Sequence, residues 1–193
     1  MNIINKKRNK DINILTVDLD WIRNQRQGLE LIKFLKPLIE NTETIFVRAH
    51  HQAYNFVPEE SHLYNIDHHH DMTYGRDTKL YTDVIEKGIF NESQWVLAAA
   101  KFKKLKSYTW IKNYDSELIM NNITQPIRAL PIFRMFDELN EFVKIMPKFK
   151  RIIICESLDY ESQAPFYYAL FKYLATNYKE VIEDNWKAYR GIR

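Results

Sequence analysis

Short apolar runs alternate along this chain with longer segments in which apolar residues recur every three or four positions. Runs of the first kind predict buried strands, and segments of the second kind predict amphipathic helices. The pattern predicts strands at residues 13–20, 44–49, 63–67, 107–111 and 151–155. It predicts helices at residues 29–39, 91–105, 133–146 and from Pro165 onward, the last with Phe166, Leu170, Phe171 and Leu174 on one side.

Strands that alternate with helices indicate an α/β fold: a mostly parallel sheet with helices on both faces, in three layers. A length of 193 residues is enough for one domain with a substantial core. We find no internal repeat or linker, so residues 1–193 are expected to form a single domain. Residues 1–11 are polar and basic and are expected to be flexible or peripheral.

Polar side chains gather where the predicted strands end. Asp18 and Asp20 end the first strand, His50 and His51 follow the second, Asp67 to Asp71 end the third, and Glu156 follows residues 151–155. The carboxyl ends of parallel strands meet at one edge of the sheet, and ligands of such folds bind there. Four strand ends are therefore expected to bring carboxylates and imidazoles together.

All six histidines fall between His50 and His70, and three of them lie in the stretch Asp67-His68-His69-His70-Asp71. On an extended segment, residues i, i+2 and i+4 share one side, so Asp67, His69 and Asp71 would converge while His68 and His70 point away. Histidine is the usual nitrogen ligand for a transition metal. The pattern therefore predicts a metal site.

The number of candidate ligands indicates two ions rather than one. Two pairs of carboxylates and two imidazoles are too many for one catalytic ion; the candidates are Asp18, Asp20, Asp67, His69, Asp71 and one of His50 and His51. Oxygen-rich ligation without thiolate favours a hard ion such as Mn²⁺, with Fe²⁺, Co²⁺ and Zn²⁺ as alternatives. Two ions lower the pKa of a shared water molecule and so suit hydrolysis.

Composition and charge limit the classes of function that the chain can have. Only four glycines occur, and no phosphate loop or dinucleotide fingerprint is present. A net charge of +3, from 28 basic and 25 acidic residues, is too balanced to predict nucleic-acid binding. Cys155 is the only cysteine, and no signal peptide or run of about 20 apolar residues is evident. We expect a cytoplasmic protein without a nucleic-acid or membrane partner.

These motifs resemble those of a known family. Asp67-His68-His69-His70-Asp71 is similar to the Asp-x-His-x-Asp element of arginases and other ureohydrolases, and Val17-Asp18-Leu19-Asp20 to their Asp-x-Asp element. The stretch from Phe46 to Gln52, followed by the Asp67 motif, resembles a divergent branch that includes the peptide arginases. That resemblance implies an arginase-like fold and a manganese enzyme that converts arginine residues of a ribosomally made precursor peptide to ornithine, releasing urea.

The resemblance also implies individual roles. His51 would bind the first ion, since His51-Gln52 matches the family's His-Gln pair. Asp67, His69 and Asp20 would bind the second ion, with Asp71 and Asp18 bridging. In arginases the Asp-x-Asp element comes second, whereas here it comes first, so a circular permutation of the sheet is expected. The asparagine expected after the second aspartate is missing, which argues against recognition of free arginine.

A guanidinium group needs an acidic partner. Glu156 is the first candidate because it follows a strand at the same edge, and Asp159 is the second. His70 is a candidate proton carrier. Two alternatives stay open: hydrolysis of another small guanidine or amide, and a non-catalytic module that uses metal for stability or peptide binding. The oligomeric state is not predicted.

Overall fold

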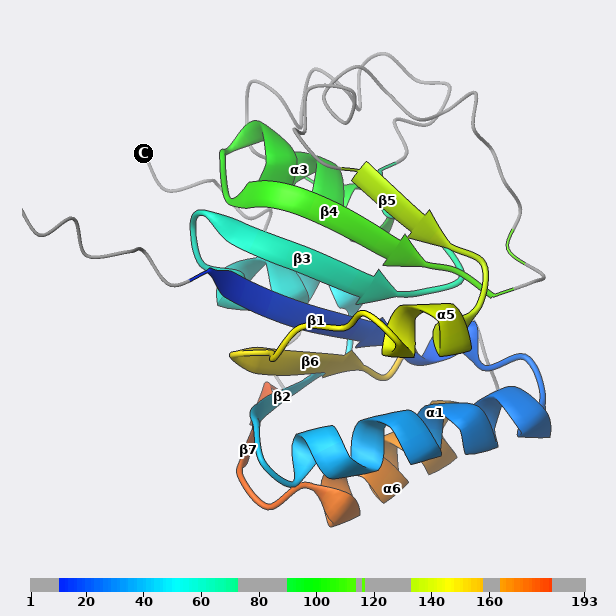
Figure 1. Cartoon of the computed structure of the whole chain (residues 1–193). Coiled ribbons are helices and arrows are strands. Elements are labelled where there is room, and N and C mark those ends of the chain that lie inside the picture. The colour runs from blue at the N-terminus through cyan, green and yellow to red at the C-terminus, as the bar shows by residue number, and fades with distance from the viewer. Residues whose placement is uncertain (1–10, 73–89, 114–115, 117–132, 158–163, 182–193) are drawn as a thin grey trace, which may run out of the picture.

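The computed structural model describes residues 11–72, 90–113, 116, 133–157 and 164–181. These residues contain a seven-stranded sheet in the order β5-β4-β3-β1-β6-β2-β7, and neighbouring strands are parallel throughout (Figure 1). The strands are β1 (Ile12–Asp18), β2 (Glu43–Val47), β3 (Ser61–Ile66), β4 (Leu105–Ile111), β5 (Phe133–Phe136), β6 (Arg151–Cys155) and β7 (Tyr178–Val181).

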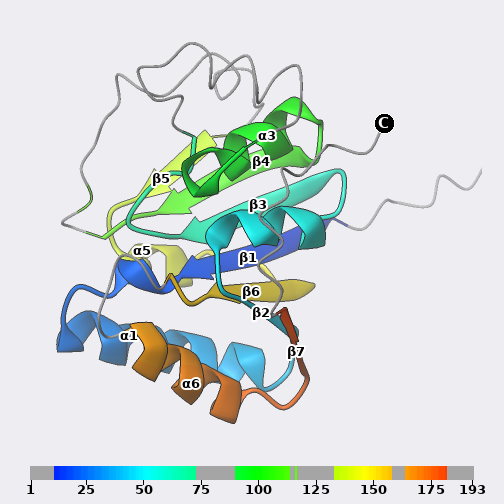
Figure 2. The ribbon, with the colours of Figure 1, turned by 180° about the vertical axis from the view of Figure 1, so that it is seen from behind.

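Helices cover both faces of this sheet. One face carries α1 (Gln25–Ile39), α5 (Leu139–Val143) and α6 (Ala164–Leu174), and the other carries the 3-10 helix η2 (His50–Phe56) and α3 (Trp95–Lys101) (Figures 1 and 2). Two further 3-10 turns are η1 (Leu19–Trp21) and η4 (Glu92–Gln94). From β1 the chain moves one way to β2 and then returns past β1 to β3. Right-handed crossovers in opposite directions place their helices on opposite faces. The predicted three-layer α/β fold is confirmed.

Each central strand contributes to two apolar cores because successive side chains point to opposite faces. In β1, Leu15 and Val17 pack on the side of α1 and α6, while Ile14 packs on the side of η2 and α3. Strands buried on both faces are apolar at nearly every position, which explains why β1 and β6 were evident in the sequence. By the same alternation, Asp18 at the end of β1 faces the side of η2.

Three predicted helices differ from the structure. The helix predicted at residues 91–105 consists of η4 followed by α3 and ends at Lys101, and Leu105 already belongs to β4. Residues 133–136 form the edge strand β5 rather than the start of a helix, and α5 is only five residues long. The four residues of this stretch show no clear alternation of apolar and polar positions, and pairing with β4 decides their conformation. In α6, the buried side is formed by Tyr167, Tyr168 and Phe171, whereas Phe166 is 66% exposed.

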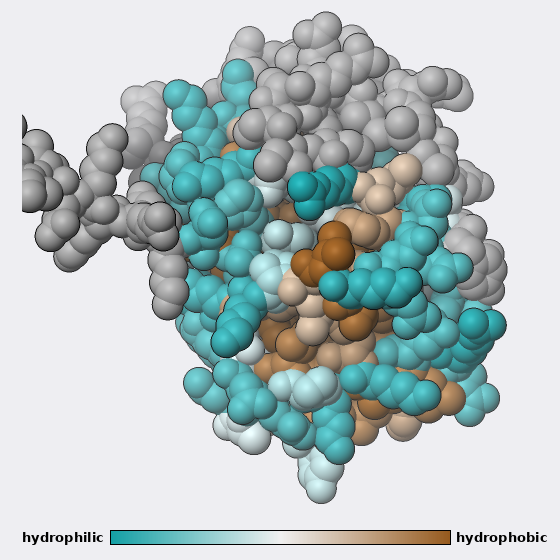
Figure 3. Space-filling view, in the orientation of Figure 1, coloured by the Kyte–Doolittle hydropathy of each residue, from teal (hydrophilic) through white to brown (hydrophobic). Residues whose placement is uncertain are grey.

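The surface is mixed in character. In the view of Figure 3, hydrophilic residues surround a central area in which apolar residues gather between the strands and α1. Val143 and Ile145, at the end of α5, are among the exposed apolar side chains of the described residues. Within the same residues, no helix has the length and apolar character needed to cross a membrane.

Helices α1 and α6 approach each other closely at Gly28. A Cβ atom added to Gly28 would overlap the hydroxyl and ring of Tyr167 in α6. Tyr167 is itself buried in the core between these helices. The close helix contact therefore requires glycine at this position, although glycine normally weakens a helix interior.

We expect Gly28→Ala to destabilise the protein by about 1–2 kcal/mol, because overpacking outweighs the gain in helix propensity. The corresponding fall in melting temperature is roughly 2–6 °C for a chain of this size. Lys33→Ala, at an exposed position of the same helix, is the control and should change the melting temperature little. Adding Tyr167→Leu to Gly28→Ala should recover part of the loss; a fully stable Gly28→Ala variant would contradict this packing.

Candidate metal centre

Four adjacent strands carry the candidate residues to one edge of the sheet. Asp67 follows β3, Asp18 ends β1, Glu156 follows β6, and His50 opens η2 shortly after β2. Because the order of these strands is β3-β1-β6-β2, the four positions are neighbours across the sheet. The convergence predicted from the strand ends is therefore present.

The first group of possible ligands consists of Asp18, His50 and Asp67, whose ligand atoms lie within 4.8 Å of one another. His50 Nδ1 is 3.1 Å from an oxygen of Asp18, 3.1 Å from Asp67 and 2.8 Å from Asp71. None of these contacts is aligned as a hydrogen bond, and both ring nitrogens of His50 are buried without a hydrogen-bond partner. An imidazole nitrogen facing three carboxylates in this way suits ligation of a shared cation.

The second group consists of Asp20, Asp67 and His69. His69 Nδ1 lies 2.9 Å from an oxygen of Asp20, and the His69 side chain is 55% exposed. Asp67 belongs to both groups, so its carboxylate could be shared between two ions. The first group is buried throughout, whereas the second opens to solvent at His69.

Local turns, not a strand period, bring these residues together. The chain leaves β1 at Asp18, whose side chain accepts a hydrogen bond from the Asp20 N–H at 3.3 Å and caps η1. The sequence predicted that Asp18 and Asp20 both end the first strand, whereas only Asp18 lies in β1 and Asp20 lies in η1. The Asp67 carboxylate likewise accepts from the His69 N–H at 2.8 Å, and Asp71 has a φ of 51°. The segment from Asp67 to Asp71 is bent rather than extended.

A further turn positions His50. The side-chain oxygen of Gln52 accepts hydrogen bonds from the backbone N–H groups of Arg48 and Ala49, at 3.0 and 3.2 Å. These bonds fix the start of η2 immediately before His50. Gln52 thus has a structural role in the His-Gln pair of the sequence.

Buried side-chain donors form hydrogen bonds with the carboxylates and main-chain carbonyls of the cluster. Asn65 Nδ2 donates to Asp67 at 3.0 Å, and Trp95 Nε1 donates to Asp71 at 2.6 Å. Trp110 Nε1 donates to the Asp67 carbonyl at 2.9 Å, and the Tyr108 hydroxyl donates to the His70 carbonyl at 3.0 Å. Sequence analysis did not predict these roles. The available signal was that a buried indole or phenol requires a polar partner.

Burial and crowding shift the pKa values of the cluster. Burial raises the pKa of Asp67 well above its usual range, and the charges of Asp71 and Asp20 raise it further. Burial alone would lower the pKa of His50, but the charges of Asp18 and Asp71 outweigh it and the pKa rises well above its usual value. Carboxylates crowded in this way hold protons unless a cation compensates them. The donor set thus fits divalent ions.

The other predicted site residues lie around this cluster. The ring of His51 lies with Nδ1 3.8 Å from Glu92, and His50 rather than His51 enters the first group. His70 is buried; its Nδ1 accepts from the Met72 N–H at 3.0 Å, and its ring packs edge-on against Trp110. Its role as a proton carrier stays a prediction.

Of the two predicted partners of the guanidinium group, the structure describes Glu156 but not Asp159. Glu156 is largely buried, and one carboxylate oxygen lies 3.9 Å from Arg48 Nε, farther than a hydrogen bond. Burial and the charges of Glu180 and Glu156 raise the pKa of Tyr168 in α6. Asp159 lies outside the described residues.

Comparison of the chain with protein-family models, curated proteins and solved structures found no significant match.

Replacement of His50 tests the ligand assignment. We expect His50→Ala to weaken metal binding by at least about tenfold, because a ligand is lost, and His51→Ala to weaken it much less. Metal content after dialysis against Mn²⁺, measured by elemental analysis, and the rise in melting temperature on adding Mn²⁺ provide two readouts. The opposite order of effects would restore His51 as the ligand.

Proposed function

We propose that this protein is a dinuclear metal-dependent hydrolase that converts arginine to ornithine and urea, acting on arginine residues within a peptide. The observation that carries this proposal is the pair of ligand groups joined by Asp67 at the carboxyl edge of the sheet. The resemblance of Asp67-x-His69-x-Asp71 to the ureohydrolase element supplies the reaction class.

Hard divalent ions suit these residues, because the donors are carboxylate oxygens and imidazole nitrogens without thiolate, and Mn²⁺ is our first choice. Asp18, His50, Asp67 and Asp71 would hold one ion, and Asp20, Asp67 and His69 the other. Such a pair, when bound, lowers the pKa of a water molecule and makes it a nucleophile at neutral pH.

The surroundings of the two groups support a catalytic role over a purely structural one. Structural metal sites close their ligand shell, whereas catalytic sites keep a position accessible to solvent or substrate. Asp20 is 1% exposed, but its partner His69 is exposed over half of its side chain. This open side favours hydrolysis over the non-catalytic alternative.

In the proposed reaction, water adds to the guanidinium carbon, the bond to the side-chain nitrogen breaks, and a proton passes to the leaving amine. The products are the ornithine amine and urea, and the peptide backbone is unchanged. Glu156 would hold the guanidinium by charge-assisted hydrogen bonds, because β6 places it at the same edge as the ligand groups.

Incubation of the Mn²⁺-loaded protein with blocked arginine peptides and with free arginine tests the activity. We expect urea and a peptide mass loss of about 42 Da, the difference between arginine and ornithine in this hydrolysis. Free arginine should be the poorer substrate, because no charged groups for its amino and carboxylate ends are apparent in the sequence. A metal-loaded protein that forms no urea from any of these substrates would favour the non-catalytic module.

Glu156→Gln should lower kcat/KM for the peptide by about 10- to 100-fold, because a charge-assisted pair at the reacting group is lost. Metal content should not change. The matched control is Arg48→Gln, which removes the ionic neighbour of Glu156. If Glu156 served only to pair with Arg48, the two variants would behave alike; if it binds guanidinium, Arg48→Gln retains activity.

A further inference from the structure

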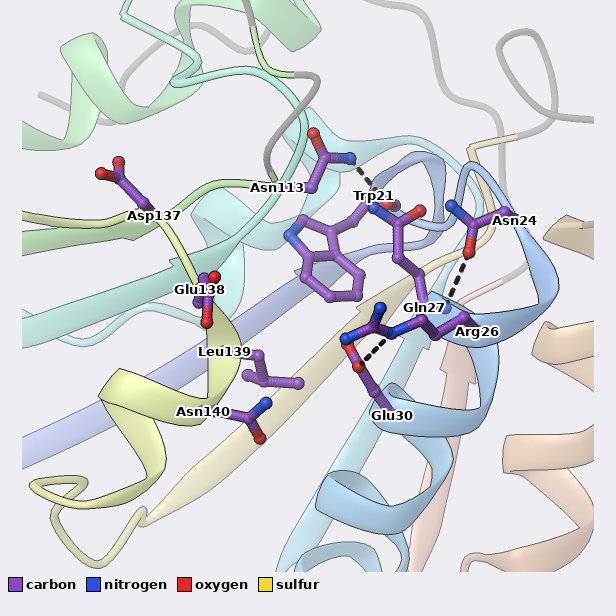
Figure 4. Close-up of a pocket in the computed structure, with 10 residues that line it drawn as sticks. All are labelled: Trp21, Asn24, Arg26, Gln27, Glu30, Asn113, Asp137, Glu138, Leu139 and Asn140. Atoms are coloured by element: carbon purple, nitrogen blue, oxygen red, sulfur yellow. Dashed lines mark hydrogen bonds and ion pairs between the residues drawn. The ribbon is translucent and has the colours of Figure 1, made fainter.

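A pocket of about 260 Å³ lies between η1, the start of α1 and the segment that leads from β5 into α5 (Figure 4). Trp21 and Gln27 form one wall, and Glu138 and Leu139 lie opposite in Figure 4. Nothing in the proposed chemistry uses this pocket.

Two buried hydrogen-bond donors of this pocket have no partner among the described residues. They are the indole Nε1 of Trp21 and the side-chain Nε2 of Gln27. The two residues are 2% and 4% exposed. The orientation of the Gln27 amide is fixed, since its oxygen accepts from the Arg23 N–H at 2.7 Å and its nitrogen must therefore be the other terminal atom. A buried donor without a partner costs free energy, so this pair calls for an acceptor.

The charges around the pocket select the kind of acceptor. Its lining includes the carboxylates of Glu30, Asp137 and Glu138 and one cation, Arg26, which pairs with Glu30 at 3.1 Å. Asp137 is paired from outside the lining by Lys112 at 2.9 Å. An anionic ligand would face this acidic rim, whereas a neutral carbonyl oxygen can accept from both donors without that repulsion.

Two connections link the pocket to the second ligand group. Trp21 directly follows Asp20 in η1. Asn113, which also lines the pocket, donates to the Trp21 carbonyl at 2.8 Å and has its side-chain oxygen 3.2 Å from His68 Nδ1. His68 in turn precedes His69. The pocket and the second ligand group are thus connected through η1 and through the side chain of Asn113.

We propose that this pocket is a subsite for the peptide main chain, in which Trp21 Nε1 and Gln27 Nε2 donate to a backbone carbonyl of a residue next to the reacting arginine. This assignment rests on the proposed function for the identity of the reacting residue. A peptide offers a neutral main-chain carbonyl to these donors. Free arginine offers a carboxylate instead, and the acidic rim of the pocket would repel that charge. The subsite would therefore favour peptide over free arginine.

The indole N–H resonances provide a test that does not depend on turnover. The chain has four tryptophans, and Trp21→Phe identifies the resonance of Trp21 in the ¹⁵N-labelled protein loaded with Zn²⁺, which is diamagnetic and does not broaden nearby resonances. The probe is a blocked pentapeptide of alanines with norleucine in place of arginine, which cannot be hydrolysed. We expect a saturable downfield shift of the Trp21 indole proton and no comparable shift with free arginine.

Two variants measure the contribution of the donors. Trp21→Phe keeps an aromatic ring and removes the N–H, and Gln27→Glu keeps the acceptor for Arg23 while replacing the donor. Each should weaken binding of the norleucine peptide by about 3- to 10-fold, the usual effect of one hydrogen bond. Bound metal should stay unchanged. Arg26→Gln, which alters the rim but not the buried donors, is the control and should bind the peptide at least as well.

The outcomes separate this subsite from the proposed activity. A Trp21 resonance that does not respond to peptide, in a protein that releases urea from arginine peptides, would overturn the subsite and leave the hydrolase proposal in place. A response of Trp21 without urea from any arginine peptide would support the subsite as a peptide site and overturn the hydrolase proposal. An equal response to free arginine would overturn the preference for a neutral carbonyl.

Discussion

The burial of four carboxylates at one edge of the sheet is the constraint on which the rest of this structure depends. Asp18, Asp20, Asp67 and Asp71 are each at most 5% exposed. At an effective dielectric constant of about 20, two like charges about 4 Å apart repel by roughly 4 kcal/mol, which is a large part of the stability of a domain. His50 and His69 compensate part of this charge at best. Bound protons or a bound cation would relieve this repulsion, and carboxylate and imidazole donors are those that a divalent cation takes.

The surrounding core is arranged to hold these charges in place. Trp95 and Trp110 fill the space between the sheet and its helices, and both direct their indole N–H groups at the cluster. Thr16, Asn65 and Tyr108 extend this support: the Thr16 hydroxyl donates to Asn65 at 2.5 Å, and Asn65 donates to both Asp67 and Tyr108. Donors that orient a ligand from behind restrict its movement, and this is how a protein prepares a metal site before the metal binds.

The sequence predicted the fold class and the edge that carries the cluster, because buried parallel strands have a strong apolar signal and their carboxyl ends coincide. It did not predict β5, whose four residues lie at the edge of the sheet and depend on pairing with β4. The structure brings Asp67, His69 and Asp71 to the cluster, but by a different local geometry from the one expected, and their role as ligands stays a prediction. An extended segment was expected, whereas hydrogen bonds from the backbone to Asp67 and a positive φ at Asp71 form a bend. A turn of this kind depends on specific hydrogen bonds, and the alternation of residues along an extended segment does not predict them.

The choice between His50 and His51 shows the same limit in a single residue. The family pair His-Gln indicated His51, but the turn fixed by Gln52 directs His50 to Asp18, Asp67 and Asp71. The two ligand groups then differ in access, since His50 is 2% exposed and His69 is open to solvent. In the proposed function, substrate would approach from the open side, and an ion held by Asp20, Asp67 and His69 would face it. Trp21 follows Asp20 in η1, so the proposed peptide subsite and the second ligand group are linked through one short turn.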